Sequence, residues 1–173
     1  MIRFFRSFRA WALLALLAAL AFWLERQGSE TIVGPSGAGI HVIDGDSLRI
    51  GGREIRIAGI DAPEYRQTCT DAGGAAWPCG KEARTALERL VQAGGISCET
   101  AVEDRYGRAL ARCRSSAGDL AEAMARQGWA EGAGDKRFKE PSAAIAEAKK
   151  AKRGIWRGGH SHPAEWRKAN AGT

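Results

Sequence analysis

Three short apolar segments joined by glycine-containing turns, all within residues 39–60, restrict the fold more than any other feature of this sequence. The segments are 39–43, 47–50 and 53–60. Gly51 and Gly52 separate the second segment from the third, and a glycine pair at such a place signals a tight hairpin. In the third segment Ile55 and Ile57 share one face, as expected for a half-buried strand. The sequence therefore predicts three consecutive strands of an antiparallel sheet.

The remaining elements complete a small α+β domain. Apolar periodicity and stop signals predict helices over 81–93, 119–127 and 141–154, and strands over 96–103 and 108–114. Five strands with a helix between the third and the fourth fit a small closed antiparallel β-barrel of the OB type, here with three helices. A chain of 173 residues has room for one such domain and for additional tails.

The N-terminal segment is predicted to direct the chain to export. Residues 1–9 are basic and aromatic, and residues 11–24 form an unbroken apolar run of 14 residues, as in a secretory signal. About 20 apolar residues make a comfortable membrane span. Residues 19–21 (ALA) offer a cleavage site, but the apolar run continues beyond it. A cleaved signal peptide and an uncleaved anchor are both open, and a buried core helix fits poorly because the arginines lie on one side of the run only.

The chain is predicted to have four parts with a mild basic bias. They are a signal peptide or signal anchor at 1–26, a glycine- and serine-containing linker at 27–39, the folded domain at 40–156 and a polar, loosely ordered tail at 157–173. We expect the domain to be periplasmic, secreted or anchored to the inner membrane. The net charge of +6 falls to +3 without the charged residues of the first 29 positions, which are Arg3, Arg6, Arg9, Glu25 and Arg26. Such a bias suits a polyanionic partner but does not by itself indicate one.

The four cysteines fit an exported protein. Cys69, Cys79, Cys98 and Cys113 contain no CxxC pair, which argues against a zinc ribbon or a thioredoxin-like motif. In an oxidising compartment an even number predicts disulfides. Cys98 and Cys113 are equidistant from the turn at 106–107 and can face each other across an antiparallel pair, which leaves Cys69 to Cys79. The sequence allows two other pairings, and free buried thiols are a further alternative.

Acids and arginines lie at the ends of the predicted strands. Asp46, Asp61 and Glu64 surround Arg56 in the sequence, and Arg108 follows in the second half of the domain. Carboxylates bind hard cations, and guanidinium groups hold phosphates through paired hydrogen bonds. This mixture is what cleavage of a phosphodiester requires.

Five segments occur in a recognisable order and context. They are 42–47 (VIDGDS), 56–64 (RIAGIDAPE), 106–108 (YGR), 124–130 (MARQGWA) and 148–156 (AKKAKRGIW). Together they resemble the thermonuclease family, the staphylococcal-nuclease-like proteins, over roughly residues 40–156. The resemblance implies an OB barrel with three helices and calcium-dependent hydrolysis of DNA and RNA phosphodiesters.

The resemblance also implies a role for each acid. Asp46 and Asp61 match the two calcium-binding aspartates of the family, and Ala62 stands where a backbone carbonyl contacts the metal. Two carboxylates leave coordination positions for water and for a phosphate oxygen. Glu64 matches the glutamate usually assigned as the general base that activates or orients the attacking water.

The arginines and the neighbouring turn are assigned in the same way. Arg56 and Arg108 match the two arginines that bind the phosphate and offset the charge that grows in the transition state. Arg105 and Tyr106 match positions near the bound nucleotide. We therefore expect DNA or RNA as substrate, Ca²⁺ as cofactor, membrane contact only through an uncleaved N-terminal segment, and a monomeric protein.

One departure from the family pattern affects nucleotide binding. Better-known members carry tyrosines that contact the nucleotide after the fourth segment, whereas residues 131–138 contain none and offer only Phe138. This departure concerns base preference and substrate affinity and leaves the hydrolytic residues untouched. A separate alternative function is a catalytically inactive OB domain that binds nucleic acid or a protein partner. The complete set of acids and arginines favours the enzyme.

Four other residues receive weaker predictions. Asp44, beside a glycine, is expected to be a turn residue. His160 and His162 resemble a metal-binding pair but have no third ligand nearby in the sequence, so we expect no metal there. Trp77, in the segment between the first two cysteines, is a candidate platform for base stacking.

Overall fold

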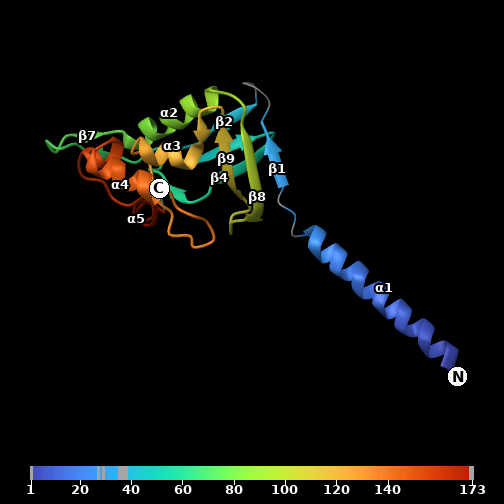
Figure 1. The fold of residues 1–173 in the computed structure, drawn as a ribbon. Coiled ribbons are helices and arrows are strands. Elements are labelled where there is room, and N and C mark those ends of the chain that lie inside the picture. Colours follow the sequence, from blue (N-terminus) through green and yellow to red (C-terminus); the bar gives the residue numbers. More distant parts are fainter. Residues whose placement is uncertain (1, 27, 29, 35–38, 172–173) are drawn as a thin grey trace. The chain divides into compact units, whose positions relative to one another are not determined.

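The computed structural model (Figure 1) describes residues 2–26, 28, 30–34 and 39–171. The chain divides into two compact units, Met1–Glu30 and Thr31–Thr173. Residues 27, 29 and 35–38 of the predicted linker, and 172–173 of the predicted tail, lie outside the described residues.

The second unit is built on a curled mixed sheet whose strands lie in the order β1-β8-β9-β4-β3-β2, with β10 paired to β9. The strands are β1 (Glu30–Val33), β2 (Ile40–Val42), β3 (Ser47–Ile50), β4 (Arg53–Ile57), β8 (Ser97–Glu103), β9 (Ala109–Ser115) and β10 (Gly118–Asp119). Neighbouring strands are antiparallel in β2–β3, β3–β4 and β8–β9, but β4 and β9 run parallel. This parallel pair brings the two arginine-bearing regions of the sequence side by side.

The predicted closed, antiparallel, five-stranded barrel needs correction. The five predicted strands correspond to β2, β3, β4, β8 and β9, and within the described residues no ladder joins β1 to β2. Part of the predicted linker forms β1, because Ile32 packs against the core and Gly34 donates its N–H to the Ile96 carbonyl at 2.9 Å. The sheet is therefore a curled half-barrel with more strands than the sequence predicts.

The predicted strand over 53–60 is also divided. β4 ends at Ile57, and Gly59 adopts a φ of 83°, a conformation that suits glycine. The chain then forms β5 (Ile60–Asp61), which pairs with β11 (Glu131–Gly132) in a separate two-stranded ladder. The turn at Gly59 thus takes Asp61 off the main sheet and places it opposite Glu131.

Four α-helices belong to the second unit. They are α2 (Cys79–Gln92), α3 (Leu120–Arg126), α4 (Ser142–Lys150) and α5 (Pro163–Ala169), with a 3₁₀ turn η1 (Gly154–Arg157) between the last two. The three predicted helices correspond to α2, α3 and α4. The core lies between these helices and the sheet, and its fully buried side chains include Leu48, Ile55, Ile57, Ile60, Leu87, Leu120 and Met124.

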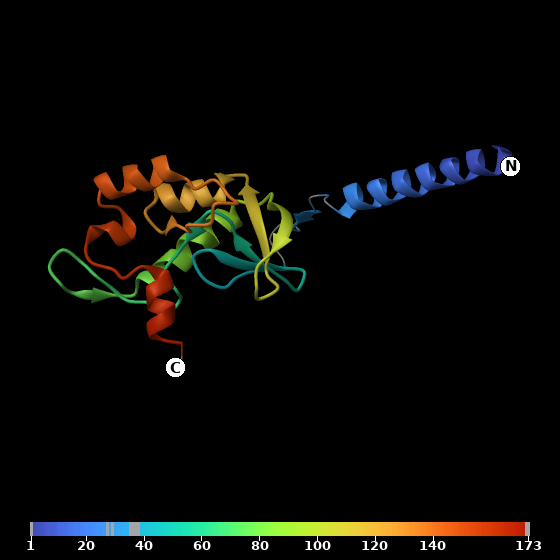
Figure 2. The ribbon, with the colours of Figure 1, turned by 90° about the horizontal axis from the view of Figure 1, so that it is seen from below.

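The predicted disulfide pairing is confirmed. Cys98 and Cys113 are direct partners in the register of β8 and β9 and are joined by a disulfide. Cys69 is joined to Cys79. This second bridge ties α2 to the hairpin of β6 (Cys69–Thr70) and β7 (Ala76–Trp77), which projects from the rest of the unit in Figure 2.

The predicted loosely ordered tail is wrong for residues 158–169, because this segment is tied to the hairpin region and then forms α5. The Thr70 N–H donates to the Gly159 carbonyl at 2.8 Å. The Gln67 side-chain amide donates to the Ser161 carbonyl, also at 2.8 Å. These contacts fix the point at which α5 begins.

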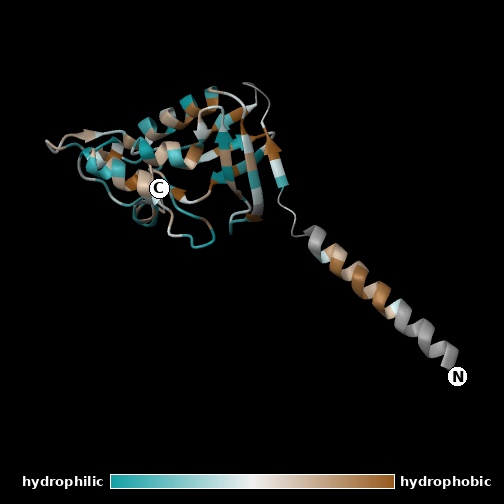
Figure 3. Cartoon of the chain, in the orientation of Figure 1, coloured by the Kyte–Doolittle hydropathy of each residue, from teal (hydrophilic) through white to brown (hydrophobic). Residues whose placement is uncertain are grey.

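The first unit contains one helix, α1 (Ile2–Arg26), whose central part is apolar, as Figure 3 shows. It includes the apolar run that the sequence predicts as a signal peptide or anchor. Among the helices of the described residues, none is long and apolar enough to cross a membrane.

Candidate active site

Arg56 joins the two aspartates that the sequence predicts as metal ligands. It lies on β4, and its guanidinium donates through Nη1 to Asp46 Oδ1 at 2.7 Å and through Nη2 to Asp61 Oδ1 at 2.6 Å. Asp46, at the start of β3, is 1% exposed, and its Oδ2 accepts from the Ala62 N–H at 2.8 Å. Burial acts to lower the pKa of Arg56, but the charges of Asp46 and Asp61 outweigh it and raise the pKa above its ordinary value.

Glu64 is held in place by Gln67, a residue that the sequence analysis did not single out. The Glu64 N–H donates to Gln67 Oε1 at 3.2 Å, and the Glu64 carbonyl accepts from the Gln67 N–H at 2.7 Å. The side of the same turn is closed by Gly80 at the start of α2, where an added Cβ would lie 1.8 Å from the Glu64 carbonyl oxygen. The backbone of Glu64 is therefore fixed, while its carboxylate faces the cleft.

Arg167, on α5, is the second functional residue that the sequence analysis missed. Its guanidinium donates to both oxygens of Asp61, through Nη1 to Oδ1 at 2.9 Å and through Nη2 to Oδ2 at 3.0 Å. Nη1 also donates to Glu64 Oε1 at 2.7 Å. One guanidinium from the predicted tail thus bridges a predicted metal ligand and the predicted general base. The available signal was a short capped helix, since His162 precedes Pro163 and its Nδ1 accepts from the Ala164 N–H.

The electrostatics of Asp61 follow from these contacts. Burial alone would raise its pKa, but the hydrogen bonds from Arg167 and the charges of Arg56 and Arg167 outweigh burial and lower the pKa below its ordinary value. Asp61 is therefore a carboxylate between two guanidinium groups.

Asp44 occupies the turn position that the sequence predicts. Its Oδ1 accepts from the Asp46 N–H at 3.0 Å, which closes the turn before β3. Burial raises its pKa to about 7, and the neighbouring charges of Asp46 and Glu64 act in the same direction. Asp44 therefore adds negative charge beside Asp46 only when the pH is near neutral or higher.

Arg108 lies on the other wall of the same cleft, at the turn between β8 and β9. Its Nε donates to Asp104 Oδ2 at 2.8 Å, and its Nη2 lies 2.8 Å from the same oxygen, so in this structure it is paired with Asp104 and not with the acids of the opposite wall. Arg105 and Tyr106 are exposed beside it, with Arg105 Nη2 donating to the Tyr106 hydroxyl at 2.6 Å.

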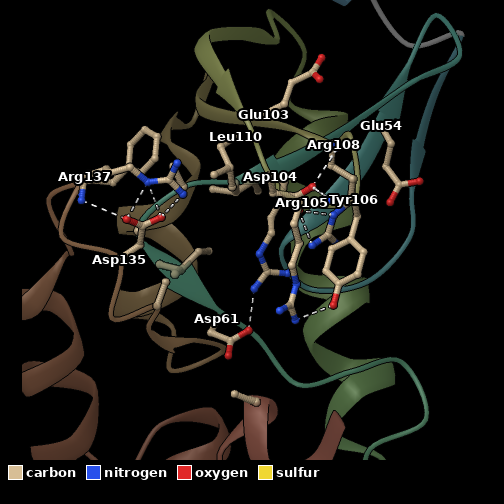
Figure 4. Close-up of a pocket in the computed structure, with 18 of the residues that line it drawn as sticks. Glu54, Asp61, Glu103, Asp104, Arg105, Tyr106, Arg108, Leu110, Asp135 and Arg137 are labelled. Atoms are coloured by element: carbon tan, nitrogen blue, oxygen red, sulfur yellow. Dashed lines mark hydrogen bonds and ion pairs between the residues drawn. The ribbon is translucent and has the colours of Figure 1, made fainter. Parts of the chain in front are cut away.

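A cleft of about 820 Å³ collects these groups. It is lined by Arg56, Asp61, Glu64, Arg108 and Arg167, among others. Asp46 is buried and does not line the cleft, but it accepts a hydrogen bond from Arg56, which does. Figure 4 shows Asp61 low in the view, with the Arg108–Asp104 and Arg105–Tyr106 pairs above it and the Arg137–Asp135 pair to one side. The cleft is therefore lined by acids and arginines on several sides, and most of these arginines are paired with an acid of the lining. Such a lining contains the groups that bind a phosphate and a cation.

The donors present fit a hard divalent cation. Asp46 and Asp61 offer carboxylate oxygens, which calcium prefers, and Ala62 is adjacent to both because its N–H is bonded to Asp46. The Arg167 guanidinium already fills a cationic position between Asp61 and Glu64. In the part of the chain that the structure describes, no three Asp, Glu, His or Cys side chains are already grouped as a metal site.

Three weaker predictions meet specific contacts. His160 and His162 do have a neighbouring acid, because Glu131 lies 2.5 Å from His160 Nε2 and 3.2 Å from His162 Nε2. Both histidines contact the same carboxylate, and the expectation of no metal there stays a prediction. Trp77 is buried, edge-on to Trp129 and covered by the guanidinium of Arg157 at 3.4 Å, so it offers no free face for a base.

Phe138 lies where the family resemblance leads one to expect nucleotide contacts. It lines the cleft together with Arg137, whose guanidinium stands 5.9 Å from the Phe138 ring and is paired with Asp135. The rim on this side therefore combines an aromatic ring with a salt-bridged arginine and has no phenolic hydroxyl.

Part of the second unit matches a known protein family. The family model described as staphylococcal nuclease homologue matches residues 54–158. The match includes Arg56, Asp61, Glu64 and Arg108, and it leaves Asp46 and Arg167 outside its ends.

Several curated proteins are similar over the same region. The succinoglycan biosynthesis protein ExoI of Rhizobium meliloti is 40% identical over 100 residues, which cover 57% of this chain and 50% of that protein. The probable endonuclease LCL3 of Schizophyllum commune is 33% identical, over 68% of this chain and 45% of its own length. The staphylococcal-like nuclease CAN1 of Arabidopsis thaliana is 32% identical, over 68% of this chain and 34% of its own length. The chain thus spans half or less of the length of these relatives.

Proposed function

Because the chain belongs to the family of staphylococcal nuclease homologues, we propose that it is an exported, calcium-dependent nuclease that hydrolyses phosphodiester bonds of DNA or RNA. Relatives named endonuclease and staphylococcal-like nuclease support the general class. The calcium requirement, the substrate and the location are the finer parts of the proposal.

One observation carries the proposal: Arg56 joins the buried Asp46 to Asp61, and Arg56 and Asp61 line one cleft together with Glu64 and Arg108. The acids come from the start of β3 and from β5, and the two arginines come from β4 and the turn before β9. Four separate parts of the fold thus supply the groups that phosphodiester cleavage needs, and they line one cleft of about 820 Å³ or contact its lining.

The arginines and Glu64 have distinct tasks in this proposal. Arg56 and Arg108 hold the phosphate from two sides and neutralise the charge that develops on its oxygens. Glu64 accepts a proton from the attacking water, while Arg108 donates a hydrogen bond to the leaving oxygen. The hydrogen bonds between Gln67 and the Glu64 backbone keep this base at a fixed distance from the phosphate.

Asp46, Asp61 and the Ala62 carbonyl are the groups that would hold calcium. The bound ion would supply Lewis-acid polarisation of the phosphate. The position of Asp46 supports this role, because its hydrogen bonds with Arg56 and the Ala62 N–H orient its carboxylate. Arg56 is anchored between both aspartates and remains in place to contact the phosphate.

Two features support export. The basic N-terminus followed by an apolar run has the composition of a secretory signal. Two disulfides with no free cysteine in the described chain fit an oxidising compartment.

The test is digestion of plasmid DNA, single-stranded DNA and RNA by the full, oxidised chain, with calcium and with a chelator. We expect cleavage that requires calcium and that is lost in Glu64→Gln. A protein that binds these nucleic acids but leaves them intact at every calcium concentration would refute the enzyme.

A second candidate is a binding domain without catalysis. The observation that favours it is the contact of Arg167 with Glu64 and Asp61, because it engages the predicted base and a predicted metal ligand at once. In that case Arg167→Gln would also be inactive, and binding of nucleic acid would be independent of calcium.

A further inference from the structure

The position of Arg167 implies more than an additional basic residue in the cleft. Both oxygens of Asp61 accept a hydrogen bond from its guanidinium, at 2.9 and 3.0 Å, and a third bond reaches Glu64. Such a two-pronged contact is the strongest form of arginine–carboxylate pairing. A cation cannot take the same Asp61 oxygens in the same positions while this contact is made.

We infer that Arg167 is a built-in competitor of the divalent cation, which lowers the affinity of the Asp46–Asp61 site and must leave Asp61 when the cation binds. This inference rests on the calcium site of the proposed function and adds to it the residue that sets its affinity.

The two guanidinium groups on Asp61 differ in their freedom to move. The Arg56 side chain is 13% exposed, and it is fixed in β4 between two aspartates. The Arg167 side chain is 40% exposed and is carried by a helix of seven residues. Arg167 is therefore the partner that can withdraw from Asp61 without disturbing the sheet.

The attachment of α5 also allows it to move. Pro163 is the only buried residue of this helix and Trp166 is half-buried, while Glu165, Lys168 and Ala169 are exposed. The segment before the helix is held separately, through the hydrogen bonds of Ser161 to Gln67 and of Gly159 to Thr70. These bonds keep α5 next to the site, where it competes at high effective concentration.

The balance of charge favours replacement of the Arg167 guanidinium by a divalent ion. Asp46, Asp61 and Glu64 carry three negative charges against the positive charges of Arg56 and Arg167. A divalent ion that replaces Arg167 restores more positive charge than it displaces, whereas an ion that enters beside Arg167 is repelled by it. By linkage, the factor by which the Arg167 contact lowers the affinity for calcium equals the factor by which bound calcium weakens the contact of α5 with Asp61.

The experiment is direct measurement of calcium binding by titration calorimetry on the full, oxidised chain, comparing the wild type with Arg167→Gln. We expect the variant to bind calcium at least about tenfold more tightly, within the usual range of coupling between two ligands. The matched control is Lys168→Gln, which removes the same charge from an exposed neighbour on α5 and should change the affinity by less than about twofold. Arg167→Lys keeps the charge without the fork and should give a smaller increase than Arg167→Gln.

A second readout follows α5 itself. Amide hydrogen exchange of residues 164–169 in the wild type should become faster when calcium is added, because the helix loses its contact with Asp61. It should be fast in Arg167→Gln with or without calcium, whereas exchange in β3 and β9 should be the same in both proteins, which confirms that the variant is folded.

The outcomes separate this inference from the proposed function. Equal calcium affinity in the wild type and in folded Arg167→Gln overturns the inference but not the nuclease. Tighter calcium binding by Arg167→Gln, with no cleavage of nucleic acid by the variant or by the wild type, supports the inference and overturns the nuclease. No calcium binding by any of the proteins overturns both.

Discussion

Replacing Arg56 by methionine should destabilise the fold far more than the same change at Arg49. Arg56 is the charged partner of Asp46, whose side chain is only 1% exposed, and it also contacts Asp61 at 5% exposure. Removing one member of a buried ion pair leaves the other charge buried and typically costs about 3–5 kcal/mol. Arg49, on the neighbouring strand β3, pairs with Glu54 on the surface at 47% and 35% exposure, and such pairs contribute about 0–1 kcal/mol.

The measurement is urea unfolding of the oxidised chain in the presence of a chelator, followed by circular dichroism. We expect a difference of about 3 kcal/mol in unfolding free energy between the two variants, at similar dependence on urea. Calcium should reduce this difference, because a divalent cation at Asp46 and Asp61 replaces the missing positive charge. If the two variants differ by less than about 1 kcal/mol without calcium, the argument from buried charge is wrong.

Three further predictions address the base, a disulfide and the turn that holds Arg108. Glu64→Gln should lower the initial rate of DNA cleavage by about 10²- to 10⁴-fold while leaving the thermal unfolding temperature nearly unchanged, and an unchanged rate would assign the base elsewhere. Replacing both Cys98 and Cys113 by alanine opens a loop with a sequence separation of 15 and should lower the unfolding free energy in urea by about 3 kcal/mol, whereas no change would show that the bridge is not formed in solution. Burial acts to raise the pKa of Asp104, but hydrogen bonds from Arg108 and Tyr106 outweigh it and lower the pKa below 3.8. Its stabilisation is therefore present above that pH and lost as the pH falls through the lowered value, so Asp104→Asn should weaken the pH dependence of stability below about pH 4, and an identical acid limb in both proteins would contradict this.

The sequence predicts well those features that depend on local pattern. Strands β2, β3, β8 and β9 follow from apolar alternation and turn glycines, and the pairing of Cys98 with Cys113 follows from their equal distance from one turn. The grouping of Asp46, Arg56, Asp61 and Glu64 is also visible, since these residues lie within 19 positions of one another.

The features that the sequence does not predict depend on contacts between distant segments. Helix α5 has one buried residue, so it lacks the apolar periodicity by which helices are recognised. Arg167 is 106 positions from Asp61, and nothing in the pattern of either segment indicates that they meet. Arg108 and its partner Asp104 are close in the sequence. The same turn region also contains Glu103 and Arg105, so the sequence alone does not show which acid pairs with which arginine.

Because β4 and β9 pair in parallel, mutations within these strands and mutations in the turn before β9 have different consequences for the site. Arg56 is paired with Leu110 and Ile55 with Ala109, so backbone hydrogen bonds set the spacing between Arg56 and the turn that carries Arg108. An insertion within β4 would shift this register and move both the arginine and the strand that follows it. Arg105 and Tyr106 lie outside the ladder, and their side chains can be replaced while Asp104 keeps Arg108 in place. Gly107 has a φ of 78° and should stay glycine. Under the proposed function, nucleotide contacts at this turn can therefore be varied without moving Arg56 or Arg108, which makes the turn the natural starting point for a change of substrate.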